Sequence, residues 1–377
     1  MDQNSLQCAL VRGGTSKGVA VARDELPEEN TNTALLSLFG SPDERQIDGL
    51  GGGTSTTSKL MIVEESNRDG IDIDYEFGQV SVRDPTIDYG GNCGNMTTVV
   101  GPFAVDQNMI DVPDYGETTV TLYNKNTETR IDQSFEVVGG RTATVGDHKI
   151  HGVPGTGARV DTTFYDPAST IEKGLFPFNE RVTTLDVDGR SVEMTVLDVT
   201  TPVVFVRASD LGVTGTELPE DIDNNPEFLD RIEQIRATVC TELGIVNSPE
   251  DATVESPGFP KIAFVAPPTD YEATVGHVTE SEIDITARIM SMQYLHPVYA
   301  VTGASCTAAA TLLEGTIPNQ VADAPDSGTV ELGHPKGKMS IEASVNGNNT
   351  VESVTVSRTH RRLMEGQAFY TLETNGQ

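Results

Sequence analysis

The chain has 377 residues, 37% of them hydrophobic, so it can bury a large core and is longer than one core usually organises. It carries 57 acidic and 25 basic residues, which gives a net charge of −32. Such a charge repels nucleic acids and anionic membranes, so binding to polyanions is excluded as a function. Because ~1 M salt screens charges beyond about 3 Å, we expect a protein that works at high salt.

The sequence contains no signal for membrane attachment or for a disulfide scaffold. Residues 1–4 lack the basic and apolar segments of a signal peptide, and no stretch approaches the ~20 apolar residues that span a bilayer. The four cysteines form no Cys-x-x-Cys pair, so neither a zinc ribbon nor a thioredoxin motif is indicated. We therefore expect a cytoplasmic protein with free thiols and no membrane partner.

The first segment predicts two strands joined by a glycine-rich turn. Residues 6–12 and 19–22 are apolar and typical of strands, and the turn between them holds Thr15, Ser16 and Lys17. Its backbone N–H groups, two hydroxyls and the lysine charge can cradle an anion. The turn lacks the Walker spacing, so a nucleotide site is not indicated, and a hairpin turn without a ligand is the alternative.

A short helix over residues 33–40 comes next, followed by a hydroxyl-rich segment that ends in a lysine. Residues 49–58 are rich in glycine, threonine and serine and include Ser55, and Lys59 stands at the mouth of the next strand. A flexible linker is the alternative interpretation. A linker would not run directly into the apolar residues 60–63, so we assign Lys59 to an active site.

The stretch 90–96 (Gly-Gly-Asn-Cys-Gly-Asn-Met) leads from a loop into a short helix through residues 97–100 and places Cys93 at its start. The first N–H groups of a helix have no intrahelical partner and the dipole is positive there, which favours a thiolate. A small cysteine that only packs in the core is the alternative. The flanking glycines count against it, because they let backbone N–H groups approach a ligand closely.

A similar pattern recurs far downstream, where glycine and small residues lead into Cys306 and then into a helix-prone run of alanine and leucine. Two cysteines in equivalent local settings suggest duplicated halves that face each other across a cleft. We therefore predict an N-terminal half over residues 1–184 and a C-terminal half over residues 185–357. The tail 358–377 is a candidate addition to the first half.

Most of the remaining segments predict strands, at residues 71–82, 118–124, 130–138, 142–150, 192–199, 203–206, 262–266, 340–356 and 368–372. Residues 226–243 form the clearest amphipathic helix, and Cys240 lies near its apolar stripe, so we assign this cysteine to the core. Residues 186–189 resemble part of a calcium loop, but Leu197 replaces the expected glutamate, so no metal is predicted. The basic cluster 357–362 interrupts the last strands and either holds carboxylates or balances local charge.

Several segments resemble motifs of the PrpF family, which contains 2-methylaconitate cis-trans isomerases and relatives that tautomerise 4-oxalomesaconate or shift the double bond of methylitaconate. These segments are residues 12–18, 51–59, 92–96, 291–293, 302–307 and 358–364. These motifs are distributed along nearly the whole chain in the order that the family has them. They are therefore specific for the family although not for its substrate. One departure is Thr201, where the family pattern has asparagine before Pro202, which removes one expected contact to substrate.

The resemblance implies an α+β fold similar to diaminopimelate epimerase, with two pseudo-symmetric halves, each a curled mixed β-sheet wrapped round a central helix. It implies a cofactor-independent isomerase that moves a proton in an unsaturated di- or tricarboxylic acid such as 2-methylaconitate. The family's lysine and cysteine motifs fall on Lys59 and Cys93, and Cys306 is a third catalytic candidate. No metal and no organic cofactor are expected.

The same segments supply the expected contacts to substrate, which are Thr15, Ser16, Lys17, Ser55, Asn92, Gly94, Asn95, Ser291, Met292, Ser305 and Thr307. We expect desolvation to favour the free amine of Lys59 as a base, while Cys93 exchanges a proton at the other terminus. N–H groups at Cys93 and Cys306 and the hydroxyls would hold the dienolate-like charge. The expected binding partner is a small-molecule polycarboxylate, and no nucleic acid is expected to bind. The sequence does not decide whether the protein forms a homodimer.

Two other classes of function fit the sequence. A non-catalytic carboxylate-binding protein that supports an aconitase-like dehydratase would bind ligand without exchanging protons with solvent. A cofactor-free amino-acid racemase or epimerase fits the layout with two cysteines, but its ammonium-bearing substrate suits these cationic and N–H-rich loops less well. The sequence does not choose among 2-methylaconitate, oxalomesaconate and methylitaconate.

Overall fold

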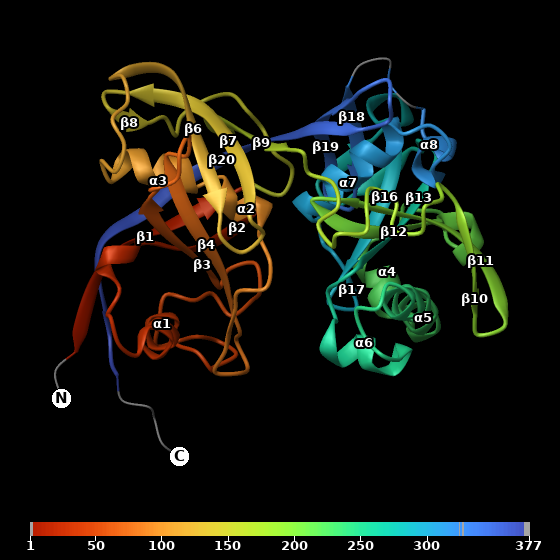
Figure 1. The fold of residues 1–377 in the computed structure, drawn as a ribbon, viewed down its shortest axis with the longest axis horizontal. Helices are drawn as coiled ribbons and strands as arrows, with labels where there is room; N and C mark the ends of the chain where they lie inside the picture. Colours follow the sequence, from red (N-terminus) through yellow and green to blue (C-terminus); the bar gives the residue numbers. More distant parts are fainter. Residues whose placement is uncertain (1–2, 324, 326–327, 373–377) are drawn as a thin grey trace. The chain divides into compact units, whose positions relative to one another are not determined.

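The computed structural model describes residues 3–323, 325 and 328–372. The chain divides into two compact units, unit 1 with Met1–Thr163 and Ser357–Gln377 and unit 2 with Phe164–Val356. The long strand β20 (Val351–Tyr370), blue in Figure 1, contributes to both units. Residues 357–370 of this strand are therefore part of the sheet of unit 1.

Unit 1 consists mainly of strands. Its strands are β1 (Asn4–Gly13), β2 (Ser16–Ala22), β3 (Lys59–Glu65), β4 (Ile73–Val80), β5 (Ile87–Asp88), β6 (Tyr115–Asn124), β7 (Thr129–Val138), β8 (Arg141–Thr142) and β9 (Arg159–Tyr165). Its helices are α1 (Thr31–Phe39), α2 (Gly94–Thr97) and α3 (Val100–Asp106). These bounds confirm the predicted strands at the start of the chain, the helix after them and the short helix that follows Cys93.

The strand pairings of unit 1 form a closed mixed barrel. β1 pairs antiparallel with β20 and β2, β2 runs parallel to β3, β3 antiparallel to β4, β4 parallel to β6, and β6 antiparallel to β7. β9 pairs with both β7 and β20, which completes the circuit. A barrel closed in this way leaves few free strand edges.

The two faces of the β3–β4 region pack against different helices. Residues of α1 form a core cluster with Leu60 and Ile62 of β3. Helix α3 is buried along its whole length and contacts β3, β4 and β6. Because side chains alternate along a strand, Lys59 and the other odd-numbered residues of β3 point away from α1.

A buried glutamine bridges the break between α2 and α3. Helix α2 ends at Thr97 and α3 begins at Val100, so the ladder of backbone hydrogen bonds is interrupted between them. The Oε1 atom of Gln133 accepts a hydrogen bond from the N–H of Gly101 (2.9 Å), and its Nε2 donates to the carbonyl of Thr97 (2.8 Å). This side chain satisfies backbone groups that would otherwise be buried without partners.

Unit 2 is also built on mixed strand pairing and has more helices, and its β14 and β15 pair with each other in a separate two-stranded sheet. Its strands are β10 (Thr183–Val187), β11 (Arg190–Val199), β12 (Thr201–Arg207), β13 (Lys261–Ala266), β14 (Tyr271–Ala273), β15 (Gly276–Val278), β16 (Ile285–Ser291), β17 (Tyr294–Leu295), β18 (Thr329–His334) and β19 (Gly337–Val345). Its helices are α4 (Pro219–Asp223), α5 (Pro226–Glu242), α6 (Pro249–Glu255), α7 (Val301–Leu312) and α8 (Ile317–Val321). The predicted amphipathic helix corresponds to α5, and Cys240 is buried as expected.

Helix α7 forms the core of unit 2 together with the sheet. It contacts β11, β12, β18 and β19, and most of its residues are buried. Its small side chains, including Ala304, Ala308, Ala309 and Ala310, let the strands approach closely.

Three predictions of strand extent are wrong. The segment expected over residues 340–356 is two antiparallel strands, the end of β19 and the start of β20, joined by a turn over residues 346–350. The strand expected over residues 142–150 ends at Thr142, because the turn-forming Gly146 and Asp147 lead into a loop that is held by one bridge between His148 and Gly157. The basic cluster 357–362 does not interrupt the final strands, since β20 continues through it. Pairing with β1 and burial of alternate side chains outweigh the repulsion between neighbouring basic residues.

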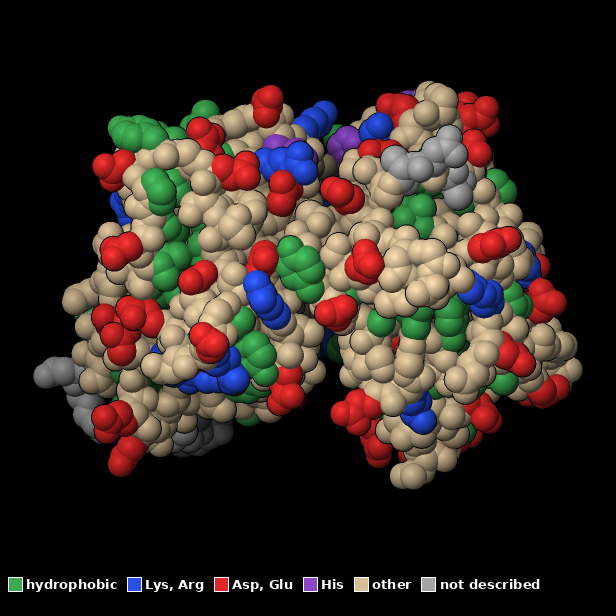
Figure 2. Space-filling model, turned by 45° about the horizontal axis from the view of Figure 1, so that its top comes forward, with side chains coloured by type: hydrophobic (Ala, Val, Ile, Leu, Met, Phe, Trp, Pro, Cys, Tyr) green, Lys and Arg blue, Asp and Glu red, His purple; other side chains and the backbone are tan. Residues whose placement is uncertain are grey.

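The surface carries the acidic excess that the composition predicts. Figure 2 shows aspartate and glutamate side chains spread over both units, with fewer lysines and arginines between them. Within the described residues, no helix is both long enough and apolar enough to cross a membrane.

Candidate active site

The turn between β1 and β2 docks directly on the start of α2. Its two residues are Gly14 and Thr15, and Gly14 has a left-handed backbone with φ +50°. The N–H of Thr15 donates to Oδ1 of Asn95 (3.3 Å), and Nδ2 of Asn95 donates to the hydroxyl of Thr15 (3.1 Å). Two of the predicted substrate contacts therefore hold each other in place.

Two glycines of this hairpin are required by close approach. A Cβ atom on Gly14 would lie 2.0 Å from Oδ1 of Asn95, and one on Gly18 would lie 2.0 Å from the carbonyl oxygen of Lys59. Real side chains do not tolerate such distances, so both positions need glycine. The β1–β2 hairpin thus contacts both the segment that contains Asn95 and the segment that contains Lys59.

The hydroxyl-rich segment before Lys59 is an ordered loop rather than a free linker. The N–H of Lys17 donates to the carbonyl of Thr56 (2.9 Å). Oε1 of Gln46 accepts from the N–H of Gly53 (2.9 Å) and from the hydroxyl of Ser58. Gln46 is buried and was missed from the sequence, because nothing in the local pattern distinguishes it from a polar surface residue.

The predicted contacts in the hairpin and this loop differ in exposure. Ser16 is buried, whereas Thr15 and Lys17 are half-buried. Ser55 is exposed at the turn of the loop. The hydroxyl-rich segment therefore presents only part of its polar groups to solvent.

Lys59 begins β3 and is buried on the face of the sheet opposite α1. Its side chain is 9% exposed, and Nζ lies 5.2 Å from the ring centroid of Phe77. Nζ donates a hydrogen bond to Oε1 of Gln79 (2.6 Å), the residue directly across from it on β4. The amine is thus fixed by a neutral acceptor and an aromatic ring.

Cys93 is the N-cap of α2 and is half-buried. Its N–H donates to Oδ1 of Asn92 (2.8 Å), and its carbonyl accepts the first intrahelical bond, from the N–H of Thr97 (2.8 Å). The N–H groups of residues 94–96 precede that bond, so the helix itself gives them no partner. Gly94 and Asn95 are themselves buried, so this turn is well enclosed.

A buried tyrosine lies behind this turn. The hydroxyl of Tyr75 is within hydrogen-bonding distance of the side chains of Thr97 (3.2 Å), Asn124 (2.9 Å) and Asn92 (3.4 Å). Burial raises the pKa of Tyr75, and the nearby Cys93 raises it further. The side-chain oxygen Oδ1 of Asn92 accepts from the hydroxyls of Tyr75 and Thr97 and from the N–H of Cys93, so it stabilises the local structure.

Tyr75 also shows which face of the sheet carries the site. Along β4, Tyr75, Phe77 and Gln79 alternate onto one face, and Tyr75 reaches α2 through Thr97. Lys59 contacts Phe77 and Gln79, so it lies on the same face. The structure therefore brings Lys59 and the Cys93 turn onto one side of one sheet.

The basic cluster of β20 contributes a buried cation beside the hairpin. Burial lowers the pKa of Arg358 to about 10, and its Cδ atom lies 3.3 Å from the place a Cβ of Gly14 would take. Arg12 donates from Nη1 to the carbonyls of Gly14 (2.9 Å) and Thr359 (2.8 Å). Arg362 instead forms an ion pair with Asp106 at the end of α3.

Cys306 has a different environment from Cys93. Helix α7 begins at Val301, so Cys306 lies in its second turn and not at its N-terminus as expected. The thiol is fully buried, its Sγ lies 3.4 Å from the carbonyl oxygen of Leu197, and burial raises its pKa well above the usual value. The sequence prediction failed because the apolar and small residues before Cys306 extend the helix.

The hydroxyls beside Cys306 are used inside the helix. Ser305 donates to the carbonyl of Val301 (3.1 Å), and Thr307 donates to that of Gly303 (2.8 Å). Both side chains are fully buried. In this structure both hydroxyls are bonded within α7, and their role in substrate binding stays a prediction.

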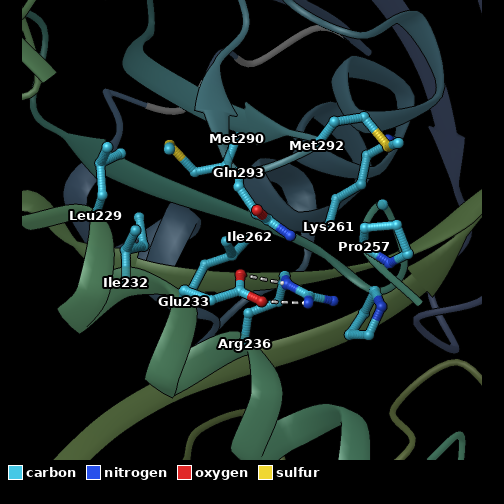
Figure 3. A pocket seen from close by; sticks show the side chains of 12 residues that line it. Leu229, Ile232, Glu233, Arg236, Pro257, Lys261, Ile262, Met290, Met292 and Gln293 are labelled. Atoms are coloured by element: carbon cyan, nitrogen blue, oxygen red, sulfur yellow. Dashed lines mark hydrogen bonds and ion pairs between the residues drawn. The ribbon is translucent and has the colours of Figure 1, made fainter. Parts of the chain in front are cut away.

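The predicted contacts Ser291 and Met292 lie elsewhere in unit 2. Met292 and Gln293 form the two-residue turn between β16 and β17, and both have positive φ (52° and 70°). Figure 3 shows Met292 and Gln293 beside a pocket whose other walls include side chains of α5 and β13. Within it Arg236 is held by Glu233 (2.8 Å from Nε to Oε2), so its charge is already paired.

No group of three or more histidine, cysteine or acidic side chains is arranged to hold a metal in the part of the chain that the structure describes. The polar groups near Lys59 and Cys93 are amides, hydroxyls and N–H groups. Such groups suit an anionic organic ligand better than a divalent cation, which prefers carboxylate oxygens or soft ligands.

Comparison with known proteins shows that the chain belongs to a protein family. The model of the family described as "PrpF protein" matches residues 3–371. The 3-methylitaconate isomerase of Eubacterium barkeri is 39% identical over 373 residues, covering 98% of each chain. The 2-methyl-aconitate isomerase of Shewanella oneidensis is 37% identical over 383 residues, covering 97% of this chain and 96% of that one.

Solved structures agree with this result. The crystal structure of a methylitaconate-delta-isomerase has a TM-score of 0.89 at 38% identity and covers 100% of this chain and 99% of its own. A probable proline racemase from Agrobacterium radiobacter has a TM-score of 0.55 at 10% identity, covering 98% and 93% of the two chains. At that identity the likeness concerns the fold alone, which is of the proline racemase type.

Proposed function

Because the chain belongs to the PrpF family, we propose that this isomerase moves a proton within an unsaturated di- or tricarboxylic acid such as 2-methylaconitate or 3-methylitaconate. Lys59 and Cys93 are the proposed proton-transfer groups. The observation that carries the proposal is their common location: a buried amine and a half-buried thiol on one face of one sheet, tied together by the β1–β2 hairpin.

The proposed chemistry uses an amine as base and a thiol as the second proton carrier. The free amine of Lys59 removes a proton from the carbon next to the double bond, and the electron pair spreads into the conjugated carboxylate. Cys93 then delivers a proton to the other end of the allylic system, or to the same end after rotation. Each transfer by a positioned group typically contributes about 10²–10⁴-fold to the rate.

The negative charge that develops needs donors nearby. The N–H groups of residues 94–96 and the hydroxyl of Thr15, which accepts a hydrogen bond from Asn95, lie at the Cys93 turn, and Lys17 and the buried Arg358 add positive charge beside the hairpin. The hydroxyl of Ser16 is a further proposed donor. In a protein of net charge −32, such a concentration of donors favours an anionic substrate. Gly94 and Asn95 keep their proposed roles as substrate contacts through the backbone.

We further propose that the two units are diverged copies of one ancestral half, each with a mixed sheet around a buried helix. The order of pairing supports this. β1, β2, β3, β4, β6 and β7 pair antiparallel, parallel, antiparallel, parallel and antiparallel in turn, and β11, β12, β13, β16, β18 and β19 repeat that series. In this alignment α7 corresponds to α2 and α3.

The proposed duplication identifies the equivalent of Cys93 in unit 2. Cys93 is the N-cap of α2, and the N-cap of α7 is Ala300. Unit 2 therefore offers no thiol at the matching position, and Cys306 is left as a core residue. A racemase with two opposed thiols is disfavoured on this ground, whereas a lysine and one cysteine suit an isomerase with two different proton carriers.

The proposal is tested by incubating the protein with a panel of unsaturated di- and tricarboxylic acids in deuterium oxide and following both isomerisation and deuterium uptake by NMR. The Lys59→Ala variant should lose both activities by at least ~100-fold, as expected for removal of a general base. Lys125→Ala, which removes a lysine paired with Glu64 at the surface, serves as the matched control.

Two results would refute the proposal. Full exchange and turnover in Lys59→Ala would remove the assigned base. Ligand binding by the wild-type protein without any uptake of deuterium would instead favour the non-catalytic carboxylate-binding alternative.

A further inference from the structure

The partner of the Lys59 amine is a neutral amide, although the neighbouring cations pair with carboxylates. Glu64 of β3 pairs with Lys125 (2.8 Å), and Glu76 of β4 pairs with Arg23 (2.7 Å). Lys59 Nζ instead lies 2.6 Å from Oε1 of Gln79. In a chain with 57 acidic residues, a glutamine at this position calls for a chemical explanation.

The amide of Gln79 is itself fixed in one orientation. Its Nε2 donates to the carbonyl of Ser58 (3.0 Å) and approaches that of Val80 (3.4 Å). Turning the amide over would place an NH2 group against the lysine amine and an oxygen against two carbonyl oxygens. The surrounding backbone therefore makes Oε1 the atom that faces Lys59.

A carboxylate in this place would have an unfavourable effect on a general base. An anion close to an amine stabilises the charged ammonium form, so the amine is deprotonated only at higher pH. A neutral amide oxygen accepts a hydrogen bond from the ammonium and also from the free amine, which keeps two N–H bonds. The contact therefore survives deprotonation and holds the amine in place in both states.

From this geometry we propose that Gln79 is a positioning residue, which orients Lys59 through its amide oxygen without the ion pair that would hold the amine in its charged form. The inference rests on the proposed function, because it assumes that Lys59 is the base. The ring of Phe77 lies 5.2 Å from the amine and helps to hold it in place, and although a ring face attracts an ammonium group, it carries no formal charge and so favours the charged form less strongly than a carboxylate would.

The test compares two substitutions that change different properties of Gln79. Gln79→Glu keeps the shape and adds a negative charge, and it should move the acidic limb of the profile of kcat/KM against pH upward by about one unit or more. Gln79→Met keeps the approximate size and removes the acceptor, and it should lower kcat about tenfold or more without that upward displacement. Gln320→Glu, at an exposed residue of helix α8 in unit 2, controls for the added charge.

A second measurement reports on Lys59 without relying on turnover. The rate of acetylation of Lys59 by acetic anhydride, followed by peptide mass spectrometry across a pH series, measures the fraction of free amine. In Gln79→Glu this rate should rise only at a pH about one unit higher than in the wild type, and thermal unfolding shows whether each variant is folded.

The outcomes separate this inference from the proposed function. Superimposable pH profiles and acetylation curves for wild type and Gln79→Glu, with Lys59→Ala inactive, would overturn the role of Gln79 alone. A fully active Lys59→Ala would overturn the function itself. A displaced acidic limb together with displaced acetylation in Gln79→Glu supports the role proposed for Gln79.

Discussion

The segments around Cys93 and Cys306 look alike in sequence and differ in structure. In both, glycine and small residues precede a cysteine and a helix-forming run. Cys93 caps its helix and is half-buried, whereas Cys306 lies within α7 and is fully buried. The comparison shows that a local pattern can predict a helix without predicting on which residue it begins.

The cause of the difference lies in the residues that come before each cysteine. Gly90, Gly91 and Asn92 disfavour helix, and the side chain of Asn92 accepts the N–H of Cys93, which stops the helix there. Before Cys306 the chain reads Val-Thr-Gly-Ala-Ser, and Ser305 donates to a carbonyl within the helix, so the helix extends backward to Val301.

The largest expected contrast between the two cysteines is their reactivity. Alkylation follows the thiolate fraction and exposure, and burial raises the pKa of Cys306 well above its usual value. We expect iodoacetamide to modify Cys93 at least ~1000-fold faster than Cys306 at pH 8, as read by peptide mass spectrometry, because buried structural thiols are inert. Cys8, whose pKa burial raises to about 11, is an internal control.

Equal labelling of Cys93 and Cys306 in the folded protein would break the comparison. After unfolding in denaturant the cysteines should react at similar rates, which shows that the difference comes from the fold.

The second contrast concerns buried titratable groups. Burial lowers the pKa of His360 on β20 to about 4, while its Nε2 contacts the carbonyl of Ala143 (3.1 Å). An unfolded histidine titrates near pH 6.5, so between about pH 6.5 and 4 the unfolded chain binds a proton that the folded chain does not. Stability therefore falls as the pH decreases through this window, by up to about 3 kcal/mol.

The His360→Gln variant should remove this part of the pH dependence, because an amide does not titrate. Denaturant unfolding at pH 7 and at pH 4.5 measures it. The exposed His277 of unit 2, replaced by glutamine, is the matched control and should leave the slope unchanged. If the free energy of unfolding changes as much between pH 7 and pH 4.5 in His360→Gln as in the wild type, groups other than His360 cause the pH dependence.

The third contrast compares a glycine of each region. In Gly14→Ala the new Cβ would lie 2.0 Å from Oδ1 of Asn95 on a backbone with φ +50°, so we expect a loss of about 1–3 kcal/mol in stability and lower kcat. In Gly303→Ala the one close contact of the new Cβ would be with the end of the Ile289 side chain, at 2.3 Å, while the next atoms lie at ordinary contact distances of 3.6 Å and more. Better helix propensity partly offsets that contact, so the loss should stay below about 1 kcal/mol.

Thermal unfolding and turnover of both variants test this contrast. The comparison is weakened if Gly303→Ala lowers kcat more than Gly14→Ala does. Gly91→Ala has open space around its Cβ and should behave like the wild type in stability.

Much of the fold could be predicted from the sequence where one signal dominates. Alternating apolar residues located β4, β6 and β7, and helical periodicity located α5, because each pattern reports directly which side is buried. The extent of β20 could not be predicted. Its basic cluster is stabilised by pairing with β1, a contact between the two ends of the chain.

The sequence indicated the candidate reactive groups of the site, but it did not indicate the residues that hold them in place. Lys59, Cys93 and Asn95 stand in conspicuous glycine-rich motifs. Gln79 and Gln46 were missed, because their roles depend on which backbone groups lie opposite them in space. A polar residue on the inward face of β4 was the one available signal for Gln79.

The central claim is that Cys93, and not Cys306, carries a proton in the reaction with Lys59. Deuterium exchange into an unsaturated tricarboxylic substrate, followed by NMR for wild type, Cys93→Ser and Cys306→Ser, tests it most directly. We predict that Cys93→Ser loses exchange at one end of the allylic system by at least ~100-fold, while Cys306→Ser exchanges within about threefold of the wild type. Wild-type exchange in Cys93→Ser, or its loss in a folded Cys306→Ser, would contradict the account.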